Sequence, residues 1–160
     1  MTSLTLQGAP VLVVGAGIMG AGIAQVAAAA GHRVMLFDTR DGAAASARER
    51  LAATLDGLVA KGKLAAGQAQ ATLARIESIA VLQQAGGARL VVEAIVEDLA
   101  AKRTLLRQLE TVVDADAVLA TNTSSISVTA LAAGLAQPRR LVGMHFFNPV
   151  PLMKLVEVVS

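Results

Sequence analysis

Cysteine, tyrosine and tryptophan are absent from this sequence of 160 residues, and phenylalanine occurs only three times. Without cysteine the chain has no disulfide framework, no thiolate nucleophile and no thiolate metal site, and we predict no bound metal. With so few aromatic rings there is little surface on which bases could stack, which argues against a nucleic-acid partner. No apolar run approaches the roughly eighteen residues that a bilayer span needs, which argues against a membrane partner.

The first ten residues, MTSLTLQGAP, also lack the features of targeting segments. They contain neither the basic and apolar regions of a secretory signal nor the arginines of a mitochondrial presequence. Together with the missing cysteine, these features favour the cytoplasm, most simply that of a bacterium. The formal net charge is only +2, and scattered lysines and arginines are typical of a solvated surface rather than a binding patch.

Short β-rich runs alternate with longer, alanine-rich runs along the chain. The pattern predicts strands over residues 10–14, 32–38, 89–95, 117–122, 140–147 and 152–159, and helices over 18–30 and 98–113. The first strand, helix and strand form a βαβ unit, which implies parallel pairing and a right-handed crossover. We therefore expect an α/β fold, a doubly wound, mostly parallel sheet of the Rossmann type, in a single domain over residues 1–160.

Residues 42–78 exceed what a minimal crossover needs. They hold two alanine-rich helical stretches joined around KGKLAAG, residues 61–67. One interpretation is a helical hairpin that projects from the sheet, and the other is an ordinary long crossover connection. The pattern by itself favours neither.

The segment VLVVGAGIMGAG contains Gly15, Gly17 and Gly20 in the spacing G-x-G-x-x-G. The spacing alone is weak evidence, but here it follows an apolar strand and opens a helix, which is the context of a dinucleotide site. Gly15 would permit the tight turn, Gly17 would let the backbone approach a pyrophosphate, and Gly20 would let helix and strand pack closely. The helix N-terminus that begins at Ile18 and Met19 would then favour the diphosphate.

Asp38 closes the second expected strand, where a carboxylate can accept hydrogen bonds from both hydroxyls of an adenosine ribose. The same carboxylate would repel a 2′-phosphate, so we predict NAD rather than NADP as the cofactor. Arg40 could soften that repulsion. The alternative is a glycine turn and a strand-end aspartate without any ligand.

His145 and Glu157 lie among apolar residues on two expected strands separated by a turn with Asn148, Pro149 and Pro151. If the chain reverses there, the two side chains come close together, and Glu157 could fix the tautomer of a histidine base. From spacing alone, a histidine satisfied by its structural surroundings is the commoner explanation.

Four segments, GAGIMGAGIAQVAA, VVEAIVED, TNTSSISVT and HFFNPVPLMKLVEVV, occur in this order. Together they resemble the N-terminal NAD-binding domain of the 3-hydroxyacyl-CoA dehydrogenase family, which includes 3-hydroxybutyryl-CoA dehydrogenases. The resemblance covers essentially the whole chain. It implies NAD-dependent oxidation of (S)-3-hydroxyacyl-CoA to 3-oxoacyl-CoA in fatty-acid or related acyl-CoA metabolism, by hydride transfer.

The resemblance also implies roles for individual residues. His145 matches the catalytic base and Glu157 its partner, and Ser124 matches the serine that hydrogen-bonds the reacting oxygen near the nicotinamide. The other matched positions are Asn148 beside that site, Glu97 and Lys102 in the nicotinamide half of the cofactor pocket, and Thr54 and Lys61 as contacts to coenzyme A. The family usually has serine where this chain has Thr54. For Glu93 we identify no role.

The family has a second, helical domain that closes over the acyl-CoA and forms most of a homodimer contact, and this sequence does not contain it. We therefore expect a truncated domain that binds NAD but has little dehydrogenase activity alone. Two other functions stay open: a non-catalytic NAD-binding module, and a 3-hydroxyadipyl-CoA dehydrogenase of phenylacetate breakdown. A β-hydroxyacid dehydrogenase fits less well, because those enzymes use a lysine from a later domain and lack a segment such as HFFNP.

Overall fold

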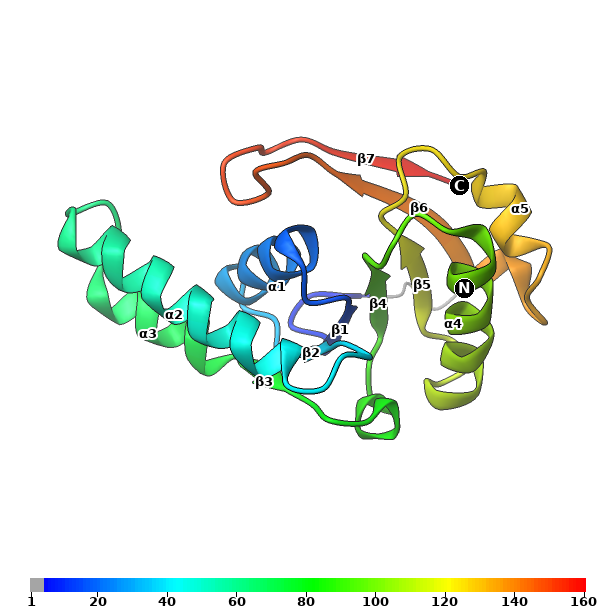
Figure 1. Ribbon diagram of the computed structural model, residues 1–160, viewed down its shortest axis with the longest axis horizontal. Helices are drawn as coiled ribbons and strands as arrows, with labels where there is room; N and C mark the ends of the chain where they lie inside the picture. The colour runs from blue at the N-terminus through cyan, green and yellow to red at the C-terminus, as the bar shows by residue number, and fades with distance from the viewer. Residues whose placement is uncertain (1–4) are drawn as a thin grey trace.

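The computed structural model describes residues 5–160 and has one seven-stranded sheet with helices on both faces (Figure 1). The strands are β1 (Val11–Val14), β2 (Val34–Phe37), β3 (Ile76–Ser78), β4 (Leu90–Glu93), β5 (Val118–Thr121), β6 (Leu141–Phe146) and β7 (Val156–Val159). Their order across the sheet is β3-β2-β1-β4-β5-β6-β7. Only β7 runs antiparallel to its neighbour. The expected doubly wound, mostly parallel sheet is confirmed.

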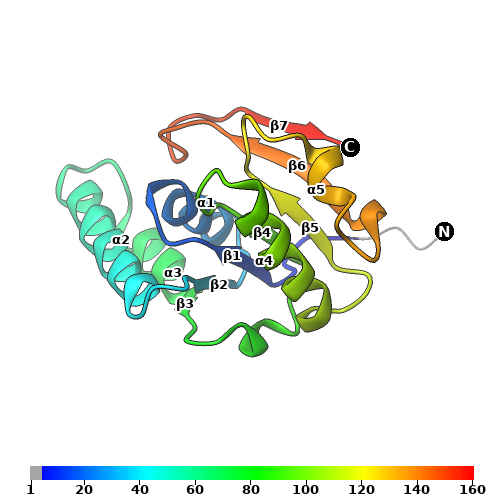
Figure 2. The same ribbon diagram turned by 45° about the vertical axis from the view of Figure 1, so that its right-hand side comes forward.

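The helices divide between the two faces of this sheet (Figure 2). They are α1 (Ile18–Ala29), α2 (Ala43–Ala60), α3 (Ala66–Ala74), α4 (Leu99–Val112) and α5 (Val128–Ala132), with short 3-10 turns at Leu82–Ala85 and Pro138–Arg140. Helices α1 and α2 contribute to the core on one face, while α4, α5 and the first 3-10 turn contribute to the core on the other. Because both faces are covered, the central strands are mostly apolar rather than alternating, and the polar residues Glu93 and Thr121 stand at the carboxyl ends of β4 and β5.

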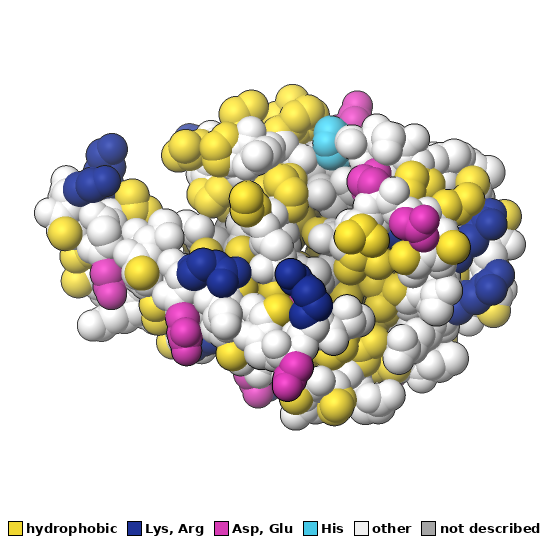
Figure 3. Space-filling model, viewed as in Figure 1, with side chains coloured by type: hydrophobic (Ala, Val, Ile, Leu, Met, Phe, Trp, Pro, Cys, Tyr) yellow, Lys and Arg dark blue, Asp and Glu magenta, His cyan; other side chains and the backbone are white. Residues whose placement is uncertain are grey.

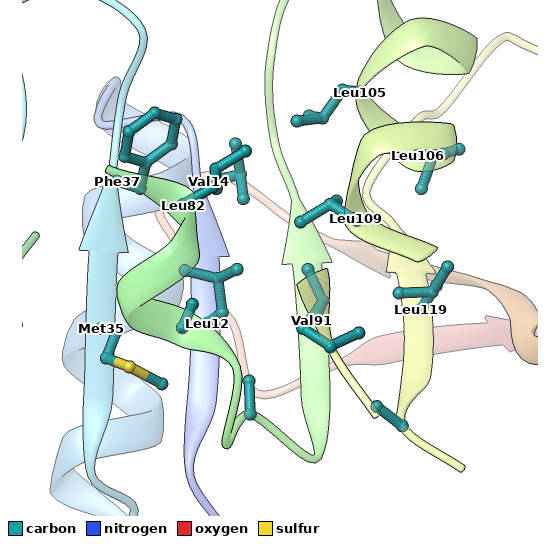
Figure 4. Close-up of a cluster of buried hydrophobic side chains, with 14 of the residues drawn as sticks. Leu12, Val14, Met35, Phe37, Leu82, Val91, Leu105, Leu106, Leu109 and Leu119 are labelled. Atoms are coloured by element: carbon teal, nitrogen blue, oxygen red, sulfur yellow. The ribbon is translucent and has the colours of Figure 1, made fainter. Parts of the chain in front are cut away.

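Each central strand supplies side chains to both cores because successive residues point to opposite faces. Leu12 and Val14 of β1 pack with Leu105 and Leu109 of α4, as Figure 4 shows. Val11 and Val13 point the other way and pack in the core under α1 and α2. The alternation fixes the register of β1 between β2 and β4, because a slip of one residue would exchange the two sets.

Helices α2 and α3 form an antiparallel pair that extends beyond the sheet (Figure 1). The same pair connects β2 to β3, which lie parallel in the sheet. The segment therefore combines both interpretations offered for residues 42–78: it is a crossover connection, and it projects. It ends in β3, a three-residue strand that the sequence analysis did not predict.

The last strand is shorter than expected. The sequence pattern predicted a strand over residues 152–159, but β7 begins at Val156. The amides of Leu152 and Met153 both donate to the carbonyl of Pro149, so the chain is still turning there. The partner strand β6 ends at Phe146, which pairs with Val156, and leaves no residue for an earlier start. The helix α5 was also not predicted.

No helix within residues 5–160 is long and apolar enough to cross a membrane.

Candidate functional site

The glycine-rich loop lies between β1 and α1, where each of its glycines meets a different constraint. Gly15 has φ +105°, and a side chain there would collide with the backbone of Ala94 on the neighbouring β4 side. A Cβ on Gly20 would overlap the carbonyl of Gly15, so helix and loop touch directly. Gly17 caps the N-terminus of α1, and no heavy atom lies within 4 Å of where its Cβ would be. The loop therefore leaves open space in front of the unpaired first-turn amides of α1, as a bound diphosphate requires.

Asp38 follows β2 directly, and its carboxylate faces the same loop. Oδ2 accepts a hydrogen bond of 2.8 Å from the amide of Ala16, while Oδ1 accepts from the backbone and side chain of Arg40 at 2.9 and 3.1 Å. The Asp38 side chain is only 8% exposed, whereas that of Arg40 is 72% exposed. The carboxylate is thus fixed by the backbone, and its second partner is an exposed guanidinium that a ligand could replace.

The pKa of Asp38 reflects these contacts. Burial by itself would raise it, but hydrogen bonds from the Arg40 side chain and from the amides of Ala16 and Arg40 outweigh the burial and lower the pKa to about 2. The carboxylate is therefore ionised at every physiological pH. An ionised acceptor suits ribose hydroxyls and repels an additional phosphate.

Three adjoining cavities follow the carboxyl ends of the strands. The aspartate cavity, of about 650 Å³, includes Gly15, Gly17 and Asp38 in its lining. The histidine cavity, of about 310 Å³, shares Ala94 and Ile95 with it. The hairpin groove, also of about 310 Å³, lies between α1, α2 and the turn after β6, and shares Gly17 with the first and Asn148 with the second. Open α/β sheets bind their ligands at this edge.

The histidine cavity brings together residues from four separate segments of the chain. Its lining includes Met19, Glu97, Lys102, Ser124, His145 and Asn148, all of which the sequence analysis had singled out. Ile18 lies beside them at the start of α1 and lines the hairpin groove instead. The glycine-rich segment, the ends of the strands and the β6–β7 turn thus all contribute to the histidine cavity.

His145 and Glu157 are direct cross-strand partners in the antiparallel pair β6–β7. Nδ1 of His145 lies 3.6 Å from Oε2 of Glu157, and their side chains are 24% and 62% exposed. The separation is longer than a hydrogen bond, so in this state the pair is a close contact that a small side-chain rotation would convert into one. The ring of Phe147 packs against the imidazole in a tilted arrangement, with ring centroids 4.5 Å apart.

Lys102 joins two carboxylates at the cavity wall. Its Nζ lies 2.7 and 2.8 Å from the two carboxylate oxygens of Glu93 and 3.1 Å from Oε1 of Glu97. Glu93 and Lys102 are buried, whereas the Glu97 side chain is 44% exposed. Glu93, for which the sequence suggested no role, is thus the buried partner that compensates the lysine charge.

Glu97 in turn holds the loop that carries Ser124. Its Oε2 accepts hydrogen bonds from the hydroxyls of Thr123 and Ser125, at 2.6 and 2.9 Å. Burial alone would raise the pKa of Glu97, but the hydrogen bonds from Thr123, Lys102 and Ser125 lower it. Ser124 lies between the two anchored residues and is itself exposed toward the cavity.

The two residues expected to contact coenzyme A are separated. Thr54 lines the hairpin groove, although its hydroxyl donates to the carbonyl of Arg50 at 2.9 Å. Lys61 follows α2 as its C-terminal cap and is not among the residues that line the groove. The described structure therefore brings Thr54, but not Lys61, to the cavities.

Several residues of the site were missed by the sequence analysis. Asn122 lines the histidine cavity, and its side-chain oxygen accepts from the amide of Phe146 at 2.9 Å, which ties the Ser124 loop to β6. Arg50 lines the hairpin groove one turn before Thr54. Asn122 follows a strand end, a position that signals function in such sheets, whereas nothing in the spacing distinguishes Arg50 from a surface arginine.

Within residues 5–160 no group of three or more histidine, aspartate or glutamate side chains could hold a metal ion.

Comparison with known proteins agrees with this geometry. A sequence model described as "3-hydroxyacyl-CoA dehydrogenase, NAD binding domain" matches residues 10–160. The chain belongs to this family. A 3-hydroxyadipyl-CoA dehydrogenase of Escherichia coli (strain K12) is 47% identical over 150 residues, covering 94% of this chain. A probable 3-hydroxybutyryl-CoA dehydrogenase of Bacillus subtilis is 42% identical over 149 residues, covering 93% of it.

Among solved structures, a 3-hydroxybutyryl-CoA dehydrogenase from Escherichia coli K12 superimposes with a TM-score of 0.92 at 47% identity, over 95% of this chain. The chain spans 32% of that structure, 32% of the Escherichia coli relative and 52% of the Bacillus subtilis relative. The family identifies the domain as one that binds NAD. The predicted cofactor is thereby confirmed.

Proposed function

We propose that the protein containing this domain is an NAD-dependent dehydrogenase that oxidises (S)-3-hydroxyacyl-CoA to 3-oxoacyl-CoA. The observation that carries the proposal is the pairing of His145 with Glu157 at the wall of a cavity that adjoins the glycine loop. A domain that only bound the dinucleotide would have no use for an oriented proton acceptor there. The relatives named above are dehydrogenases of 3-hydroxyacyl-CoA compounds, which supports the same reaction class.

The residues of this chain fit the cofactor. The open side of Gly17 and the N-terminus of α1 would hold the diphosphate, and Asp38 would accept the adenosine ribose hydroxyls. Glu97 and Lys102 would line the nicotinamide end, in the histidine cavity. Bound NAD supplies the acceptor for the hydride, so the task of the protein is to orient the substrate and to move its proton.

In the proposed mechanism His145 is the base. Glu157 accepts a hydrogen bond from Nδ1–H, so the tautomer is fixed and Nε2 is free to take the substrate hydroxyl proton. Ser124 donates a hydrogen bond to the reacting oxygen, and Asn148 lines the same cavity. The contact of 3.6 Å between His145 and Glu157 would shorten when substrate excludes water, as catalytic hydrogen bonds commonly do.

Coenzyme A would follow the hairpin groove, where Thr54 and Arg50 offer polar groups. Lys61 would add a positive charge farther along α2.

Because this chain spans only part of its relatives, we further propose that turnover requires sequence beyond it, that the complete protein is a homodimer, and that it acts in the cytoplasm. Size-exclusion chromatography with light scattering on the complete protein tests the dimer.

The experiment compares His145→Gln with the unaltered sequence in the complete protein, using (S)-3-hydroxybutyryl-CoA and NAD. Loss of the base should lower kcat by about 10² to 10⁴-fold, while calorimetry should give an unchanged Kd for NAD. His32→Gln is the matched control, because its imidazole contacts the carbonyl of Ala9 and does not line the histidine cavity. Full turnover in His145→Gln, or no binding of NAD to either protein, would refute the proposal.

A second substrate is favoured by a specific observation. The Escherichia coli relative at 47% identity is named for 3-hydroxyadipyl-CoA, which carries a carboxylate at the far end of the acyl chain. We propose it as the alternative substrate, in phenylacetate breakdown. Comparison of kcat/KM for 3-hydroxybutyryl-CoA and 3-hydroxyadipyl-CoA with the complete protein decides between them, and a preference of more than tenfold for either compound identifies it.

A further inference from the structure

Charges around the histidine cavity are unbalanced. Glu93 and Glu97 both contact Lys102, so two carboxylates share one ammonium group and one negative charge is left over. Both carboxylate oxygens of Glu93 accept hydrogen bonds, which come from Lys102, Thr121 and the amide of Ile95. Glu157 adds a further carboxylate beside His145. Figure 3 shows acidic side chains around a histidine near the top of this face, with lysine and arginine side chains farther away.

Of the two carboxylates that contact Lys102, Glu97 is the one that lines the histidine cavity. Glu93 is fully buried and compensates Lys102 at 2.7 Å, whereas the Glu97 side chain is partly exposed and lines the cavity. Serine and threonine hydroxyls, which carry no net charge, provide the other hydrogen bonds to Glu97. The cavity therefore presents a fixed negative charge held in place by three donors.

We propose that this arrangement makes the domain prefer the oxidised form of its cofactor. The nicotinamide ring of NAD⁺ is a pyridinium with a positive charge, whereas the ring of NADH is neutral. A fixed carboxylate close to the ring stabilises the first and leaves the second nearly unaffected. The inference rests on the proposed function, which puts the nicotinamide in the histidine cavity.

The proposed preference for NAD⁺ would affect both the reaction equilibrium on the protein and the release of the cofactor. A domain that favours NAD⁺ shifts the equilibrium between bound substrate and bound product toward the hydroxyacyl-CoA side, and it releases NADH more readily. The preference comes from Coulomb attraction, so it should diminish as ionic strength rises. A preference due to shape or to hydrogen bonding would not diminish as ionic strength rises.

The test measures the Kd of NAD⁺ and of NADH for this chain by calorimetry, with Glu97→Gln as the variant. Glutamine keeps the shape of the side chain and removes its charge. The ratio of the NADH Kd to the NAD⁺ Kd should fall by about fivefold, a modest change because Glu97 is partly solvated. Glu77→Gln is the control: that carboxylate is 53% exposed, pairs with Arg33 at 3.0 Å on β3, and should leave the ratio unchanged.

The outcomes separate the inference from the proposed function. If both nucleotides bind and Glu97→Gln leaves the ratio unchanged, or weakens both equally, the inference is wrong and the proposed function stands. If the unaltered chain binds neither nucleotide, both are wrong. A ratio that falls in Glu97→Gln and also falls with added salt in the unaltered chain supports the inference.

Discussion

Glu93 and Lys102 are both almost completely buried, and each makes the burial of the other tolerable. Lys102 lies on the buried side of α4 together with Leu105, Leu106 and Leu109. A charged residue in register with an apolar stripe is a signal that can be read from sequence. The identity of its partner cannot, because β4 and α4 must first be folded against each other.

Removal of Glu93 alone should lower the free energy of unfolding more than removal of both Glu93 and Lys102. Glu93→Leu removes the buried carboxylate and leaves Lys102 with only the partly exposed Glu97 as a partner. We therefore expect a loss of about 3 kcal/mol in the free energy of unfolding, the lower end for a broken buried pair. The double variant Glu93→Leu, Lys102→Met should recover most of that loss. Urea denaturation of the two variants measures the difference, and a double variant no more stable than the single one would contradict the explanation.

Asp38 should contribute to stability in a pH-dependent way. Its folded pKa of about 2 lies below that of an unfolded aspartate, about 4, so the contribution is complete above pH 4 and disappears as pH falls toward 2. At neutral pH, Asp38→Asn should lose about 1–2 kcal/mol of unfolding free energy. The difference between variant and parent should shrink between pH 4 and pH 2. Denaturation at a series of pH values checks this, and a difference that stays constant from pH 4 to pH 2 would contradict the explanation.

Single residues of the cofactor loop were predictable because their constraints are local. Gly15, Gly17 and Gly20 follow a strand and open a helix, and their spacing within that local context predicts the turn. The network of Lys102, Glu97 and the hydroxyls of the Ser124 loop was not predictable in the same way. Its members come from different elements, and only the folded sheet brings them together.

Among the elements, long helices and buried strands were anticipated from their apolar patterns, and short ones were not. Strand β3 has three residues, of which only Ile76 is buried, so it carries almost no periodic signal. Helix α5 is five residues long. Strand β7 was recognised but extended too far, because apolar residues continue through a segment that the register with β6 leaves unpaired.

Close packing of α1 against the turn after β6 gives an element-scale prediction. A Cβ on Gly22 would lie 2.9 Å from Cβ of Val150, so Gly22→Ala forces the helix and the turn apart. We expect a loss of about 1–2 kcal/mol despite the better helix propensity of alanine. Gly57→Ala in α2, where nothing lies within 4 Å, should instead stabilise the chain by about 0.5–1 kcal/mol. Thermal unfolding of both variants tests the opposite signs, and equal effects would contradict the packing argument.

At the scale of the whole molecule, the aspartate cavity, the histidine cavity and the hairpin groove lie along one edge of the sheet, and β7 is one of the two outermost strands of that sheet. Strand β7 pairs only with β6, and all four of its residues are exposed. Apolar side chains gather along it and along the segment before it, at the top of Figure 3. The opposite end of the sheet is covered by the helical hairpin (Figure 1).

The position of Glu157 on that outermost strand has a consequence for heating. Edge strands separate from a sheet at lower free-energy cost than central ones, so β7 should fray while β1 and β4 are still intact. Warming the complete protein should then abolish turnover several degrees below the temperature at which the helical circular-dichroism signal is lost, while NAD still binds. Coincident loss of turnover and fold would mean that other parts of the protein clamp β7. In the proposed enzyme, His145 would thus lose its contact with Glu157 before the NAD-binding loop after β1 unfolds.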